Sequence, residues 1–171
     1  LEMLAGVLDG HDAARLNSAL VRTQKIANAV GAGYDSTQRG PGMFMVSGVP
    51  TAGKSVAELE QGLRREIAKV ADAGISEEEL KRVKAQVVAA QVFQRDSIYF
   101  QAMQIGSLET AGYSHRAIDL MISKLQRVTA AQVREVANKY LIDDSLTVAV
   151  LDPQPLDKGK PAASEGLRHA Q

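Results

Sequence analysis

The chain has 171 residues, 45% of them hydrophobic, and its 20 basic and 20 acidic residues give a formal net charge of zero. This length suits one domain with a substantial core, and the charge balance argues against a surface for nucleic acid or an anionic membrane. No cysteine is present, which excludes disulfides, thiolate metal sites and a cysteine nucleophile. No apolar run approaches the roughly 20 residues of a membrane span.

The first residues already follow an amphipathic pattern. Leu1, Leu4 and Leu8 recur at helical spacing, and the pattern ends at Gly10. Because no capping residue precedes Leu1, we expect the chain to be a fragment of a longer protein that has a further strand or strands upstream. A second helical stretch is expected over 12–25.

Two segments then have strand character. Residues 28–35 are small and are expected to be extended, and 43–46 form an apolar run. Between them lies a cluster of turn-forming residues, Gln38 to Gly42. We therefore expect the two segments to pair as antiparallel strands.

The helix expected over 55–73 has the clearest boundaries. Ser55 and Glu58 form a capping box, and Gly74 is a typical C-terminal stop. The apolar stripe of this helix is expected to be buried. Its residues are Val56, Leu59, Leu63, Ile67 and Val70.

Further caps mark the helices that follow. Ser76 and Glu79 form a second capping box, and Thr129 and Gln132 form a third. We expect the first of these helices to be long, with a break near Gly106. The expected helices cover 76–108, 115–125 and 129–140.

The end of the ordered region is an apolar, β-branched run over 146–151, which predicts a buried strand. From Pro153 the chain is rich in Pro, Gly and charge. We divide it into a domain over 1–153 and a flexible tail over 154–171. The order of elements predicts an α+β fold, with helices packed on one face of a mainly antiparallel sheet.

One motif points to phosphate chemistry. Residues 48–55 match the P-loop pattern, with Gly48 and Gly53 in the loop, Lys54 placed to reach a phosphate and Ser55 placed to bind magnesium. However, Ser55 has a complete role as a helix cap, and the glycines have complete roles in a turn. A P-loop also needs a parallel sheet, and no apolar strand occurs between Ser55 and Leu146. We therefore interpret the segment as a turn and cap, and keep a nucleotide-binding module as an alternative.

The histidines give no metal motif. His11, His115 and His169 are isolated, and none stands in an H-E-x-x-H or H-x-x-E-H arrangement. The acidic run Glu77 to Glu79 suits the first turn of a helix. We therefore expect no catalytic residue and no metal ligand in this chain.

Four ordered stretches resemble a known family. Residues 10–22 are similar to the "G-G-x-S-S-R-L…L-R-E" segment of insulinase/pitrilysin-family peptidases, and 74–84 to "G-V-T-E-E-E-L-E-R-A-K". Residues 128–133 and 139–150 resemble the closing helix and strand of that family. The ordered set spans roughly 1–153 and implies a metallopeptidase half-domain of the LuxS/MPP-like type.

The resemblance implies a division of labour. Family members have two similar halves that close around a peptide, with zinc bound only by the N-terminal half. The C-terminal half supplies an Arg and, further along, a Tyr that hold the peptide backbone. The Arg position falls on Arg22, which becomes a candidate substrate-binding residue. The Tyr position falls on Ala29, and Tyr34 is a second candidate for the missing hydroxyl.

Three functions remain in competition. In the first, the chain is the substrate-chamber half of a zinc metalloendopeptidase, partnered by the N-terminal half of the same polypeptide and by peptide substrate, and inactive alone. In the second, it belongs to a structural, non-catalytic subunit of that family, paired with a homologous subunit. The third is the nucleotide-binding module. The resemblance also suggests the bacterial periplasm.

Overall fold

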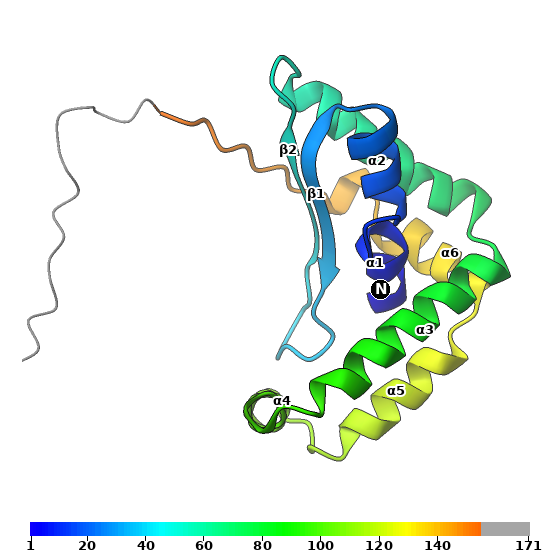
Figure 1. The fold of residues 1–171 in the computed structure, drawn as a ribbon, viewed down its shortest axis with the longest axis vertical. Coiled ribbons are helices and arrows are strands. Elements are labelled where there is room, and N and C mark those ends of the chain that lie inside the picture. The colour runs from blue at the N-terminus through cyan, green and yellow to red at the C-terminus, as the bar shows by residue number, and fades with distance from the viewer. Residues whose placement is uncertain (155–171) are drawn as a thin grey trace, which may run out of the picture.

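The computed structural model describes residues 1–154, so nearly all of the tail expected over 154–171 lies outside the described residues. Figure 1 shows the arrangement of the elements. They are α1 (Glu2–Asp9), the π-helix η1 (Asn17–Thr23), β1 (Ala27–Tyr34), β2 (Phe44–Pro50), α2 (Val56–Ala73), α3 (Glu77–Gln94), α4 (Ile98–Ala111), α5 (Ala117–Arg127), α6 (Ala130–Tyr140) and the 3₁₀ turn η2 (Asp143–Ser145).

The sheet consists of β1 and β2, which pair antiparallel, as the sequence predicts. Ala29 lies opposite Val49, and the pairing then continues residue by residue to Tyr34 opposite Phe44. An irregularity between Ala27 and Ala29 bends the start of β1. The second strand extends further than the expected 43–46, because the pairing continues up to Pro50.

Helices cover one face of this sheet (Figure 1). Val30 and Ala32 of β1 and Phe44 and Val46 of β2 point towards the helices and pack on the core. The result is the expected α+β arrangement. The fully buried large side chains are Leu4, Val7, Leu8, Leu16, Leu20, Val70, Leu80, Leu108 and Val133.

The helix caps confirm most of the expected boundaries. Both halves of the capping box form at Ser55 and at Thr129. Ser76 also caps its helix by accepting a hydrogen bond from the backbone N–H of Glu79. The carboxylate of Glu79, however, does not complete the box, because both of its oxygens accept hydrogen bonds from Arg15.

Two details of the helices differ from expectation. The long helix breaks at 95–97, not near Gly106, because the Ser97 side chain accepts a hydrogen bond from Phe100 N and starts a new helix there. Gly106 lies inside α4. Val56, expected in the buried stripe, is exposed, since it occupies the first position of α2.

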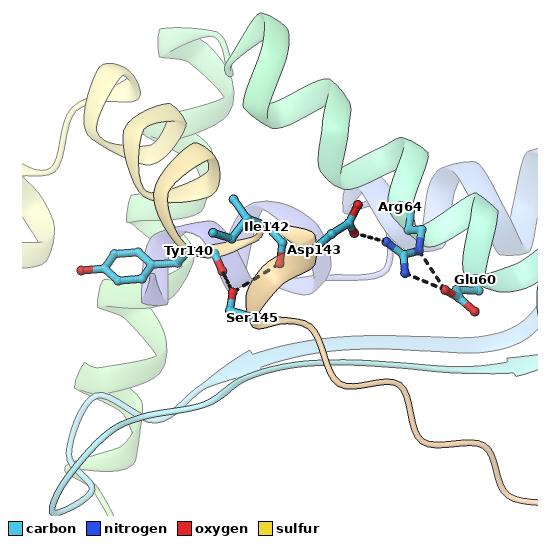
Figure 2. A network of polar contacts seen from close by, with 6 residues as sticks. All are labelled: Glu60, Arg64, Tyr140, Ile142, Asp143 and Ser145. Atoms are coloured by element: carbon cyan, nitrogen blue, oxygen red, sulfur yellow. Dashed lines mark hydrogen bonds and ion pairs between the residues drawn. The ribbon is translucent and has the colours of Figure 1, made fainter.

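The strand expected over 146–151 does not form. Its start is anchored near α2 by Asp143, which pairs with Arg64, and Ser145 donates hydrogen bonds to the carbonyls of Tyr140 and Ile142 (Figure 2). Beyond this anchor, Leu151 is 88% exposed. A β-branched run becomes a strand only when its backbone pairs with another strand, and this run pairs with neither β1 nor β2. Within residues 1–154 the sheet contains only β1 and β2.

Candidate functional site

Arg22 lies in η1, the π-helical segment that leads into β1. A π-helical turn is rare and often accompanies a functional site. The Arg22 side chain is exposed, and within the described part of the chain it forms no hydrogen bond or ion pair. Its guanidinium is therefore available to a ligand that approaches this end of β1.

The connection from η1 to β1 is strained. Lys25 has a φ of 54°, the left-handed region that favours glycine. Directly after it, Ile26 donates a hydrogen bond to Leu20 O at 2.9 Å and accepts one from Thr51 N at 3.0 Å. This sharp turn fixes where η1 and Arg22 stand relative to the sheet.

Ala29 and Tyr34 lie apart on β1. Ala29 is near the η1 end of the strand, and Tyr34 is its last residue. Strand geometry puts Tyr34 about 23 Å from Ala27, and the Tyr34 ring lies close to Gly42 instead. The structure therefore does not bring the Tyr34 hydroxyl to Arg22.

Tyr34 also lines two neighbouring hollows of about 450 and 290 Å³. The larger lies between the start of α1 and helices α5 and α6, with Met3, Leu125 and Val136 among its apolar lining residues. Its lining also includes the charged residues Glu2, Glu135 and Lys139. Of the site residues predicted from the sequence, only Tyr34 lines it.

The P-loop-like segment forms a turn and cap. Ser55 N donates to Glu58 Oε2 at 2.8 Å, and Lys54 Nζ lies 3.1 Å from Glu58 Oε1. These donors, with the backbone N–H of Ser55 contributing most, lower the pKa of Glu58. Gly53 has a positive φ of 81°, as the turn requires. Because β2 is antiparallel to β1, the parallel-sheet setting that a P-loop needs is missing from the described fold.

The remaining titratable groups have local partners. His11 Nδ1 accepts a hydrogen bond from Ala13 N at 3.0 Å, and His115 Nδ1 lies 3.0 Å from Glu109 Oε1. Hydrogen bonds from the His115 backbone and ring lower the pKa of Glu109. His169 lies outside the described residues. In residues 1–154, no group of three His, Asp or Glu residues could hold a metal ion, so these residues do not fit zinc.

A different surface stands out once the strand register is known. On the side of the sheet away from the helices, β1 presents Ala29, Gly31 and Gly33, and β2 presents Val49, Ser47 and Met45 directly opposite them. We call these six residues the open face. Sequence reasoning missed it, although the alternation of small residues in 27–34 was visible, because the pairing register decides which residues share a side.

The sequence of this chain matches a known protein family. Residues 1–87 match the family model described as the peptidase M16 inactive domain. The chain belongs to the peptidase M16 family. This result confirms the resemblance seen in the sequence, and it identifies the matched region of the M16 chain as the inactive domain.

Solved structures share the fold of this M16 chain. A candidate zinc protease from Bordetella pertussis superimposes with a TM-score of 0.72 at 21% identity, over 85% of this chain and 79% of that one. The inactive peptidase domain of a candidate zinc protease from Bordetella parapertussis gives 0.73 at 21%, over 84% and 77%. A protease from Helicobacter pylori gives 0.75 at 16%, over 84% of this chain and 34% of that one. No curated protein matches the M16 chain.

Among residues 1–154 of the M16 chain, no helix combines the length and the apolar character needed to cross a bilayer.

Proposed function

We propose that this M16 chain is the non-catalytic half of a zinc metalloendopeptidase, and that its open face forms one wall of a chamber for peptides. The observation that carries the proposal is the two-sided sheet. Helices cover one face, and the open face on the other side has no charged side chain of its own. The zinc site belongs to a partner half, because the described residues here offer no metal-binding cluster.

In this proposal the chain binds and orients the peptide and performs no chemical step. The bare open face gives an extended segment room to lie against the sheet. Arg22, at the η1 end of β1, donates hydrogen bonds to backbone carbonyls of the bound peptide. A zinc ion held by the other half would supply the activation of water.

Ala29 supports a second candidate, a structural subunit without peptidase activity. By resemblance, this position holds a Tyr that grips the peptide, and the methyl group of Ala29 cannot donate a hydrogen bond. Because Tyr34 lies far along β1, the described structure supplies no substitute hydroxyl beside Ala29.

A reconstitution assay tests the proposal. Cleavage of an unstructured fluorogenic peptide is measured with the chain alone, with the zinc-bearing half alone, and with both. We expect activity only when both are present, and a higher KM for the mixture when the chain carries Arg22→Ala. A stable complex that contains zinc but cleaves no peptide would instead favour the structural subunit.

A further inference from the structure

We propose that the open face is a binding trough for an extended, uncharged peptide segment whose sheet-facing side chains are apolar. The inference rests on the proposed chamber function and adds the chemical class of substrate that this wall accepts. It follows from the shape and the charge of the open face.

The shape comes from the strand register. Each open-face residue of β1 has at most a methyl side chain, while its partner on β2 is larger in every pair. The pairs are Ala29 with Val49, Gly31 with Ser47, and Gly33 with Met45. The surface is therefore low along β1 and raised along β2, so a chain lying on β1 has a wall on one side.

The six residues of the trough are uncharged, and one carboxylate lies beside them. Asp9 Oδ2 accepts a hydrogen bond from Ala32 N and would lie 3.7 Å from a Cβ atom on Gly31. Neither β1, over 27–34, nor β2, over 44–50, contains a charged residue, although 23% of the chain is charged. Met45 is 59% exposed and Val49 is also exposed. Burying an acidic side chain against this surface would remove its hydration and bring it near the carboxylate of Asp9, whereas an apolar side chain gains from burial.

The length of the trough suits a short peptide. Its row on β1 runs from Ala29 to Gly33, which an extended ligand would cover with about five residues over roughly 16 Å. Side chains on one side of such a ligand would point into the low row along β1. Alternate residues would point away from the sheet, so only every second side chain needs to be apolar.

Gly33 allows the trough to be filled without disturbing the fold. A Cβ atom built on Gly33 meets nothing within 4 Å, and its φ lies outside the left-handed region. Valine is compatible with a strand at this position. Gly31 is unsuitable for the same purpose, since its Cβ would lie 2.9 Å from Ser47 Oγ.

The test measures peptide binding to the chain itself. The probe is a capped peptide of about eight alternating Leu and Ser residues, compared with an analogue in which Glu replaces Leu. Binding is followed through amide chemical shifts in NMR spectra. The variants are Gly33→Val, which fills the trough, and Met45→Glu, which adds charge. Their controls are Gly106→Val, also at a position with open space, and Met103→Glu, where Met103 is 53% exposed.

We expect the Leu-containing peptide to bind with shifts in β1 and β2, and the Glu-containing analogue to bind at least about tenfold more weakly. Gly33→Val and Met45→Glu should each weaken binding by a similar factor, while the controls leave it unchanged. No binding, binding without preference between the peptides, or concentration-dependent shifts without peptide, which indicate self-association, would each overturn the inference. Because the reconstitution assay is independent, the chamber function could survive that failure.

Discussion

The guanidinium of Arg15 and the carboxylate of Glu79 form a two-pronged ion pair, with Nε and Nη2 each 2.7 Å from a carboxylate oxygen. Arg15 Nη2 also donates to Gly74 O at 3.3 Å. The side chains of Arg15 and Glu79 are only 24% and 19% exposed. This contact ties the segment before η1 to the corner between α2 and α3, and so supports the helix that carries Arg22.

Removing this ion pair should destabilise the domain. We expect Arg15→Ala to lower the free energy of unfolding by about 1–3 kcal/mol, because Glu79 and the Gly74 carbonyl lose a partly buried partner. Urea denaturation measures the change. The control is Arg82→Ala, which breaks an exposed pair with Glu78 and should change the free energy by less than about 0.5 kcal/mol. An equal loss of free energy of unfolding in both variants would contradict a stabilising role for the ion pair between Arg15 and Glu79.

The same pair predicts a pH dependence of stability. Hydrogen bonds from Arg15 are the main cause that lowers the pKa of Glu79. A carboxylate with a lowered pKa in the folded state contributes stability that is complete above its unfolded value of about 4.3 and is lost as the pH falls through the folded value. The free-energy difference between wild type and Glu79→Gln should therefore be largest near neutral pH and shrink in acid. A free-energy difference that stays constant down to acid pH would contradict a lowered pKa of Glu79 in the folded state.

The strained turn at Lys25 predicts a stabilising substitution. Lys25→Gly should raise the free energy of unfolding by about 0.5–1 kcal/mol, since glycine adopts the positive φ without strain. Lys81→Gly, in the second turn of α3, should instead cost about 1 kcal/mol. Thermal denaturation of both variants measures these changes. If Lys25→Gly destabilises the domain, the side chain of Lys25 contributes more to stability than its backbone strain costs.

The unpaired segment 146–151 predicts tolerance of charge. Val148 is 50% exposed and Val133 is 1% exposed. In this chain Val148→Asp should change the free energy of unfolding by less than about 0.5 kcal/mol, while Val133→Asp should cost more than about 3 kcal/mol. Chemical denaturation distinguishes the two. A large cost at Val148 would indicate that the segment is a buried strand after all.

Local signals in the sequence predicted much of this fold. Ser55 with Glu58 and Thr129 with Gln132 lie three residues apart, so their caps could be recognised without tertiary information. The P-loop-like segment contains the same Ser55 cap, preceded by a turn at Gly53. Ser97 carried a similar signal that the long helical pattern obscured.

Features that depend on distant partners could not be predicted. The carboxylate of Glu79 leaves its expected cap for Arg15, which lies 64 residues earlier. The run over 146–151 has strand composition but pairs with neither β1 nor β2, so its composition alone does not decide its structure. The open face appears only when Gly33 is seen opposite Met45, because shifting β2 by one residue would turn the Met45 side chain to the other side of the sheet.

The most direct measurement for the chamber proposal is site-specific photo-cross-linking in the complex with the zinc-bearing half. Because the chain has no cysteine, Met45→Cys and Met103→Cys each give one attachment point for a photoactivatable probe. Metal is removed from the complex so that peptide substrate is bound but not cleaved. Cross-links to the peptide from position 45 and none from position 103 are the predicted result. Equal labelling, or labelling from position 103 alone, would contradict a chamber wall formed by the open face.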